Sequence, residues 1–242
     1  MGGLMTDYPP ILILRLEGPM QSWGLKAKWD IRDTGEEPSK SGIVGLIGCA
    51  MGYSRNDPRL VEELDKNLRI GIRIENPGEI SKDFHTINGV LPTAEGKFKG
   101  SDGEPTTIIS IREYIEDASF LVAIEGPGQL LYKIRDAMED PRWPIYLGRK
   151  SCPPTRPIFE TITQDYGSID DVLAKYPWSS YTCEVREKYP EELKCIVEDH
   201  NGPYMRTDRV QKSPVRMYGI RNVRIFKIKA PIMKEDTCTS LD

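Results

Sequence analysis

Apolar positions in the first half of the chain follow the two-residue period of strands and the longer period of helices. Residues 11–17 form a short apolar run that ends at Gly18, which predicts a buried strand. Ser39 opens a stretch with apolar residues every third or fourth position and Gly52 closes it, which predicts a capped helix. Residues 68–75 place isoleucines on one face and arginines on the other, as in a strand with one buried face.

The same patterns predict further elements. A short helix is expected from Asp57 to Leu68, and an amphipathic helix over 128–139. Further strands are expected at 83–90, 107–114, 118–125 and 222–229. Residues 91–105 hold three Gly and two Pro with almost no apolar residues, which predicts a projecting loop or arm.

This order of elements favours an α+β fold with a ferredoxin-like (RRM-like) antiparallel sheet, helices on one face and a projecting thumb loop or hairpin. We expect the core over 8–140, with the thumb at about 91–105. Residues 141–242 are expected to form Pro-rich connections and a smaller β-rich portion. The last strand either completes the first sheet or lies in a second β module.

The overall composition favours a soluble intracellular protein without a metal or cofactor. No apolar run approaches the roughly 18 residues that cross a bilayer, and the first residues lack the pattern of a signal peptide. The 5 Cys include no C-x-x-C, so neither a disulfide framework nor a zinc site is supported. With 33 Lys and Arg against 37 Asp and Glu, the net charge of −4 is not that of a nucleic-acid-binding protein taken whole.

The charge is distributed unevenly along the chain. Residues 141–157 carry four basic residues and no acid, and residues 202–229 carry eight basic residues against Asp208. These two segments hold +4 and +7, which leaves −15 for the remainder. Because salt screens charges beyond about 10 Å, such segments either bind an anion locally or form an ordinary solvated surface.

Three short segments carry candidate binding chemistry. Gln21, Ser22 and Trp23 follow the first strand in a turned loop and offer an amide, a hydroxyl and a stacking surface that suit an unstacked base. A buried Trp that anchors a turn is the alternative. The second segment starts the first predicted helix, and the third lies in the basic stretch after residue 141.

The helix start combines Ser39, Lys40 and Ser41 with free backbone N–H groups, which together suit an anion such as an RNA phosphate. An ordinary capped helix is the alternative. In the third segment, Arg149, Lys150 and Ser151 follow Tyr146 and precede two prolines, with no acid close by. This pattern suits phosphate contact combined with stacking.

The sequence offers little for catalysis. It contains 2 His and no Ser-His-Asp signature, dinucleotide-binding glycine motif or paired acidic motif. A metal-independent ribonuclease that uses His85 as a general acid or base is the open enzyme alternative, although no cation flanks this histidine.

Several blocks of the chain resemble the CasD-type subunits of type I-E CRISPR surveillance complexes (Cascade), which bind the RNA 5′ handle and belong to the RAMP proteins. The matching blocks are I-L-R-L-E-G-P-M-Q-S-W-G at 13–24, P-S-K-S-G-I-V-G-L-I-G at 38–48, D-F-H-T at 83–86, R-E-Y-I-E-D-A-S-F at 112–120 and P-I-Y-L-G-R-K-S-C-P-P at 144–154. They span most of the first 155 residues, whereas 158–204 resembles nothing beyond the family's length.

The resemblance implies a non-catalytic, cytoplasmic subunit that caps the 5′ handle of CRISPR RNA. It implies contacts with the backbone subunit through the thumb, where Lys97, Phe98 and Lys99 fall, and with the large subunit that reads target DNA. A sister branch of the family cleaves precursor RNA, and His85 is its one positional counterpart here. The hypothesised RNA-binding residues are Gln21, Ser22, Trp23, Ser39, Lys40, Ser41, Tyr146, Arg149, Lys150 and Ser151.

Overall fold

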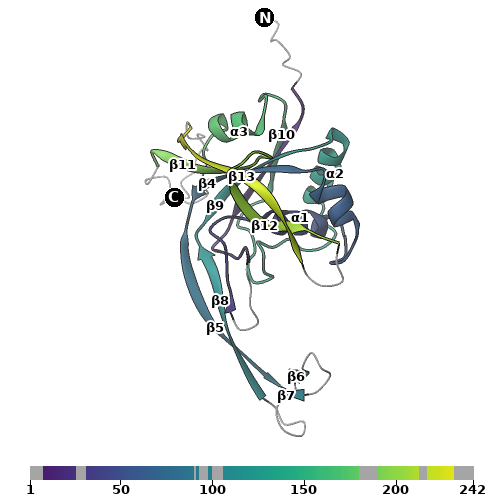
Figure 1. Ribbon diagram of the computed structural model, residues 1–242, viewed down its shortest axis with the longest axis vertical. Coiled ribbons are helices and arrows are strands. Elements are labelled where there is room, and N and C mark those ends of the chain that lie inside the picture. The colour runs from purple at the N-terminus through teal and green to yellow at the C-terminus, as the bar shows by residue number, and fades with distance from the viewer. Residues whose placement is uncertain are drawn as a thin grey trace, which may run out of the picture.

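The core of the protein is one antiparallel sheet of seven strands (Figure 1). The computed structural model describes residues 8–25, 31–89, 91–92, 98–99, 106–179, 190–212 and 217–231. The sheet has the order β10-β1-β9-β4-β11-β13-β12. Its strands are β1 (Ile11–Glu17), β4 (Arg69–Asn76), β9 (Ser119–Glu125), β10 (Phe159–Thr163), β11 (Glu192–Glu198), β12 (Tyr204–Val210) and β13 (Tyr218–Lys229).

The first four strands of this order form a ferredoxin-like unit. Helix α1 (Lys40–Ala50) connects β1 to β4, and helix α2 (Gly128–Glu139) connects β9 to β10. The chain therefore follows strand-helix-strand, then strand-helix-strand, with antiparallel pairing throughout, which confirms the expected fold class. The C-terminal strands extend this sheet beyond β4, so the last strand joins the first sheet.

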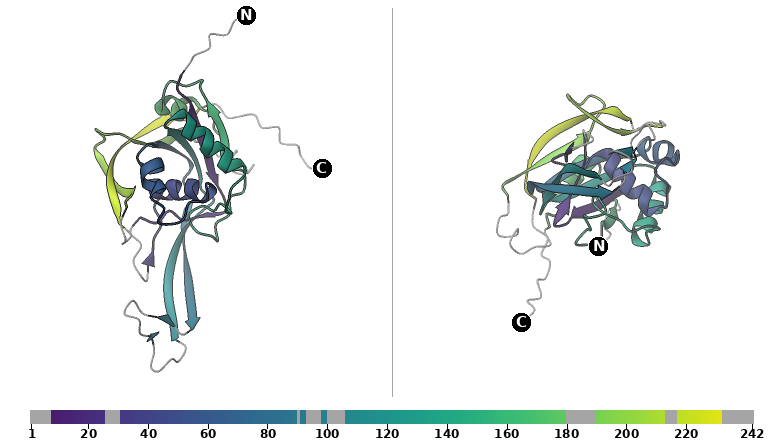
Figure 2. Two further views of the ribbon diagram at one scale, coloured as in Figure 1. Left: turned by 90° about the vertical axis from the view of Figure 1, so that its right-hand side faces the viewer. Right: turned by 90° about the horizontal axis from the view of Figure 1, so that it is seen from below.

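Alternating side chains divide the core between the two faces of the sheet. On β1, the side chains of Leu12, Leu14 and Leu16 pack with α1, α2 and the short helix η1 (Leu60–Asp65). The intervening Ile11 and Ile13 pack on the opposite face. The third helix, α3 (Ile169–Lys175), covers that face and was not anticipated from the sequence. In Figure 2 the sheet curves around α1 and α2.

A long hairpin projects from the sheet between β4 and β9. It consists of β5 (Glu79–Gly89) and β8 (Thr106–Glu116), paired along their full length (Figures 1 and 2). The short strands β2 (Met20–Gln21) and β3 (Ile31–Arg32) pair with β8 at its base. The projection therefore begins at Glu79, well before the arm expected at 91–105.

The far end of the hairpin is described only in part. Strands β6 (Leu91–Pro92) and β7 (Phe98–Lys99) pair there. The expected thumb residue Lys97 lies outside the described residues, and only the backbones of Phe98 and Lys99 are described. No helix within the described ranges is long and apolar enough to span a membrane.

Candidate nucleic-acid interface

A large groove of about 1140 Å³ lies between the base of the hairpin and the exposed side of α1. Five cations line it, and no Asp or Glu is among its described lining residues. The cations are Arg32, Arg55, Arg112, Arg149 and Lys150. The lining also includes the aromatic residues Tyr53, Trp143, Tyr146 and Tyr218. Sites that bind single-stranded nucleic acid typically combine cations for the phosphates with aromatic rings for the bases.

The floor of the groove is formed by α1. Ser41, Gly45 and Cys49 line the groove and recur every four residues, so they share one side of the helix. A Cβ placed at Gly45 would have no neighbour within 4 Å, so the helix surface is open there. The backbone of α1 is therefore accessible to a ligand along this side.

The base of the hairpin supplies two of the cations through strand register. Arg32 on β3 is opposite Arg112 on β8, and both line the groove. The preceding pair, Ile31 and Ile111, points to the other face because side chains alternate along a strand. There Ile111 is opposite Phe84, which is 65% exposed. The hairpin base thus has a cationic face toward the groove and an apolar face away from it.

The loop that carries Arg149 is built tightly against the loop after β1. The Ser22 amide donates to the Leu147 carbonyl oxygen at 3.1 Å. Gly148 has a positive φ of 89°, and a Cβ there would lie 1.7 Å from the Ser22 carbonyl oxygen, so only glycine fits. The Leu147 amide in turn donates to the Cys152 carbonyl oxygen at 2.8 Å, which closes the loop.

Arg149 is oriented by two contacts. Its guanidinium carbon lies 4.6 Å from the centre of the buried Tyr114 ring, a cation–π distance, and Nη2 donates to the Arg32 carbonyl oxygen at 2.8 Å. The Nη1 atom is buried and has no hydrogen-bond partner among the described residues. Burial raises the pKa of the Tyr114 phenol, but hydrogen bonds with Ser151 and Arg149 and the Arg149 charge outweigh it and hold this pKa below its usual value.

Gln21 and Trp23, which the sequence suggested for base contacts, have side chains inside the protein. The Gln21 amide nitrogen donates to the Leu16 and Ala118 carbonyl oxygens, and its oxygen accepts from the Trp23 indole at 3.0 Å. Trp23 is 1% exposed and packs beneath α1. Ser22 is buried and donates to the carbonyl oxygen of Glu113. Their polar atoms are used in shaping the loop, and none of the three lines the groove.

At the start of α1, side chains of the protein itself accept hydrogen bonds from the backbone amides. The Ser39 hydroxyl accepts from the Gly42 amide, as an N-cap does. The Lys40 amide donates to the Asp208 carboxylate at 2.7 Å, so the protein supplies its own anion at this helix end. The Lys40 side chain is 1% exposed and donates to Glu198 at 2.8 Å. Of the three predicted residues here, Ser41 alone lines the groove.

His85 lies on the hairpin, outside the groove lining. Its ring is 3.9 Å from the Asp83 carboxylate, and the side chain is 41% exposed. The described groove lining contains Tyr and Lys but no His. No group of three His, Cys, Asp or Glu within the described residues is placed to hold a metal ion.

The groove joins predicted and unpredicted residues. Tyr146, Arg149, Lys150, Ser151 and Ser41 were expected from the sequence and lie in it. Sequence reasoning missed Arg32, Arg55 and Arg112, and the aromatic residues other than Tyr146. The predicted strand at 107–114 could have placed Arg112 on one of its two faces. Arg32 and Arg55 lie outside the motifs that the sequence presented.

The sheet, the hairpin and the groove define an α+β protein with a cationic groove beside a projecting hairpin. The profile of the family described as CRISPR-associated protein (Cas_Cas5) matches residues 11–224. The chain therefore belongs to this family. The CRISPR system Cascade subunit CasD of Escherichia coli (strain K12) is 35% identical over 159 residues, which cover 61% of this chain and 69% of that protein.

Two solved structures support the same assignment. A chain of a CRISPR RNA-guided surveillance complex superimposes with a TM-score of 0.70 and 31% identity, covering 91% of both chains. A second structure, described as a Cas protein, gives a TM-score of 0.65 and 28% identity over 92% of this chain and 98% of the other. The similarity to CasD that the sequence blocks indicated is therefore confirmed.

Proposed function

We propose that this protein is a non-catalytic RNA-binding subunit of a type I-E Cascade complex and that its groove holds the 5′ handle of CRISPR RNA. The observation that carries the proposal is the groove itself, with five cations and no described acid. None of these cations forms an ion pair within the described part of the chain, so their charge is available to phosphates. The similarity to a Cascade subunit indicates which nucleic acid is meant.

Within the groove, each kind of side chain has a proposed part. Arg149 and Lys150 hold phosphates, and the hydroxyls of Ser41 and Ser151 add hydrogen bonds along the backbone. Tyr146 offers a ring on which a base stacks. Gln21, Ser22, Ser39 and Lys40 support the groove from behind rather than contacting RNA.

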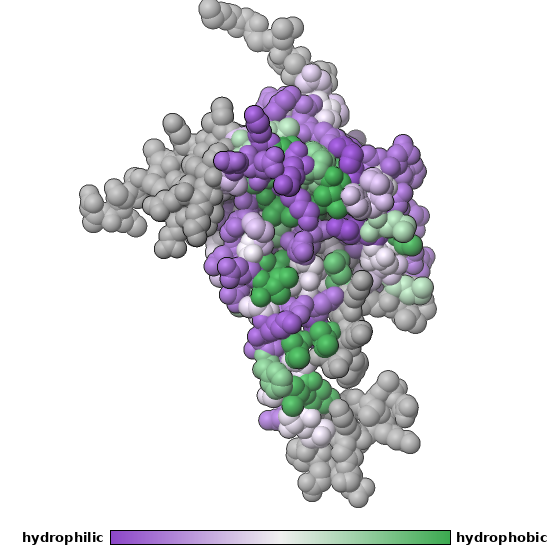
Figure 3. Space-filling model, turned by 60° about the vertical axis from the view of Figure 1, so that its left-hand side comes forward, coloured by the Kyte–Doolittle hydropathy of each residue, from purple (hydrophilic) through white to green (hydrophobic). Residues whose placement is uncertain are grey.

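The proposed protein partners meet the remaining surfaces. The hairpin exposes large apolar side chains along its length, visible as green patches on the projecting part in Figure 3. They are Ile80, Phe84, Ile87 and Ile109, together with Ile31 on β3 at the base of the hairpin. Exposed apolar area of this kind suits a protein interface, which we assign to the backbone subunit. The large subunit, which contacts target DNA, would adjoin the groove side, and the assembly would act in the cytoplasm.

The proposal is tested by RNA retention in the assembled complex. We expect Arg149→Ala combined with Lys150→Ala to lower the amount of CRISPR RNA recovered with the complex, because two phosphate contacts are lost. Lys66→Ala combined with Lys175→Ala is the matched control, since both lysines are exposed and lie outside the groove. Unchanged recovery at moderate salt in the groove variant, or crosslinking of RNA through other chains alone, would contradict the proposal.

The non-catalytic part has its own test. Purified protein is incubated with labelled repeat RNA in the presence of a chelator, and we expect no cleavage. Specific cleavage that disappears in a His85→Ala variant would establish the ribonuclease alternative instead, because His85 is the candidate general acid or base for that reaction.

A further inference from the structure

The groove continues into a second, smaller cavity of about 480 Å³. This cavity lies between the segment from Arg55 to Val61 and the end of β12. Five residues line both spaces, which makes them one continuous depression: Arg55, Asn56, Leu60, Val210 and Gln211. The smaller cavity has the size of a compartment for one small-molecule unit.

The walls of the smaller cavity combine an apolar slot with two amides. Leu60, Val61 and Val210 supply aliphatic surface. Asn56 and Gln211 each present an amide with both a donor and an acceptor, and neither has a hydrogen-bond partner among the described residues. An aliphatic slot edged by unused amides suits a flat heterocycle that carries donors and acceptors on its rim.

The charge at the rim favours a phosphate. Arg55 and Lys212 line this cavity and form no ion pair within the described ranges. Asp57 is the one acid among the described lining residues, and Arg59 donates to both of its carboxylate oxygens, at 3.0 and 2.6 Å. The hydrogen bond from Arg59 also lowers the pKa of Asp57, so this carboxylate stays ionised and paired.

The two walls are fixed to each other before any ligand arrives. The buried Asp65 of η1 accepts from Arg209 Nε at 2.9 Å and from the Val210 amide at 3.0 Å. The Arg59 guanidinium lies 3.9 Å from the centre of the Tyr53 ring, which holds the loop between them. A preformed cavity binds with a smaller loss of conformational entropy than one that must order.

We infer that this cavity receives a single unstacked nucleotide of the bound RNA. Its base enters the aliphatic slot, the amides of Asn56 and Gln211 read the edge of the base, and Arg55 and Lys212 hold the adjoining phosphate. The inference rests on the proposed function, because the nucleotide belongs to the strand in the groove. It adds base selectivity at one position to a groove that otherwise holds the backbone.

The test uses the full chain and single-stranded RNA oligonucleotides of the repeat sequence in which one nucleotide at a time is made abasic. At one position we expect the abasic oligonucleotide to bind about tenfold more weakly, since the burial of the base in the aliphatic slot and its hydrogen bonds with the two amides are lost. In the Asn56→Ala, Gln211→Ala variant, the intact oligonucleotide is expected to lose affinity, and the abasic change at that position to cost much less than in the wild type.

A second variant tests the slot without touching the amides. Val61 lines the smaller cavity and not the groove, so Val61→Trp fills the cavity selectively. We expect this variant to lose the position-specific penalty while keeping its dependence on Arg149 and Lys150. Thermal unfolding of each variant verifies that it is folded.

The possible failures are distinguishable. The inference is wrong if every abasic oligonucleotide binds the wild type equally, or if both variants keep the full loss of affinity at the same position. In either case, RNA binding that still depends on Arg149 leaves the proposed function intact. If the wild-type chain binds no repeat RNA, alone or in the complex, the proposed function fails and the inference fails with it.

Discussion

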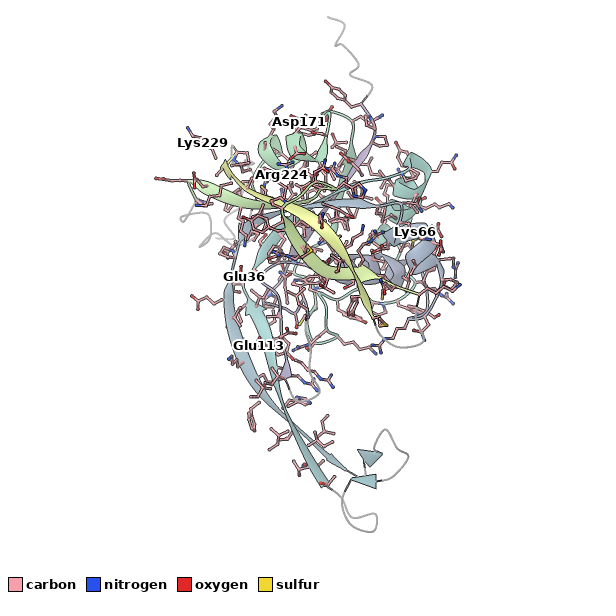
Figure 4. All side chains as sticks on the ribbon, in the orientation of Figure 1. Glu36, Lys66, Glu113, Asp171, Arg224 and Lys229 are labelled. Carbon is pink, nitrogen blue, oxygen red and sulfur yellow. The ribbon has the colours of Figure 1, made fainter. Side chains whose placement is uncertain are left out.

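Two basic segments of the chain differ in how far the fold pairs their cations with acids. In the segment 202–229, five cations form ion pairs with acids from other elements. Arg224 on β13, for example, donates to Asp170 of α3 at 2.7 Å. Figure 4 labels Arg224 close to α3, where the neighbouring Asp171 is labelled. In the segment 141–157, Arg149 and Lys150 line the groove and form no ion pair within the described residues, although Arg156 pairs with Glu160.

The difference shows that local excess charge does not identify a binding site by itself. Except for Asp208, the acids that neutralise the longer segment come from outside it: Glu37 lies 169 residues from Arg206, and Asp65 lies 144 residues from Arg209. Within the described residues, five of the seven cations of the longer segment form ion pairs, whereas three of the four cations of the shorter segment form none. A cation is available to RNA only where the fold brings no acid to it.

The largest expected effect comes from breaking a buried pair in the longer segment. Asp208 is 3% exposed, accepts from Arg221 at 2.7 and 2.9 Å and caps the Lys40 amide. Asp208→Ala leaves a buried guanidinium without its partner and α1 without its anion, so we expect the free energy of unfolding to fall by about 3 to 5 kcal/mol. Chemical denaturation measures this change.

The control for this variant is an exposed ion pair. Glu62 and Lys66 are four residues apart on the surface, so Glu62→Gln is expected to leave the denaturation midpoint nearly unchanged. A midpoint for Asp208→Ala that equals that of Glu62→Gln would show that the C-terminal cations are not structural, and the comparison between the two segments would then be wrong.

The next effect is on the salt dependence of RNA binding. For a single strand, the plot of log binding constant against log salt concentration steepens by about 0.7 for each phosphate contact. Arg149→Ala with Lys150→Ala removes two such contacts and should therefore flatten this slope by about 1.4. Arg224→Ala with Lys227→Ala removes the same charge from paired positions and should leave the slope unchanged. Binding titrations at several salt concentrations give both slopes, and equal slopes in the two variants would remove the distinction between open and paired cations.

Much of the fold was predictable because its signals are local. The apolar run of β1, the isoleucine alternation of β4 and the apolar spacing of α2 depend on neighbours within one element, and α2 was found over the residues predicted. Strand β4 nevertheless differs from the expectation of one buried face, because Arg73 is buried too. The region 158–204 carried weaker signals. Strand β10 is an edge strand with mostly half-buried residues, and α3 is only seven residues long.

The site was predictable only where its residues adjoin in sequence. Tyr146, Arg149, Lys150 and Ser151 form one loop and could be read as a group. Lys40 looked equally suited to phosphate, but Glu198, 158 residues away, pairs with it in the interior. Such long-range neutralisation depends on strand order, which a single sequence does not reveal.

The smallest predicted effect concerns the ionisation of Tyr114 beside the open cation. Burial raises the pKa of its phenol, yet the hydrogen bonds from Ser151 and Arg149 and the charge of Arg149 bring the net value below normal. Arg149→Ala removes two of the lowering contributions and leaves burial, so we expect the pKa of Tyr114 to rise. Absorbance titration of the phenolate, with Tyr114→Phe subtracted to isolate this residue, measures the shift. Arg224→Ala, which changes a paired cation on another element, is expected to leave this titration unchanged, and an equal rise there would contradict direct contact between Arg149 and Tyr114.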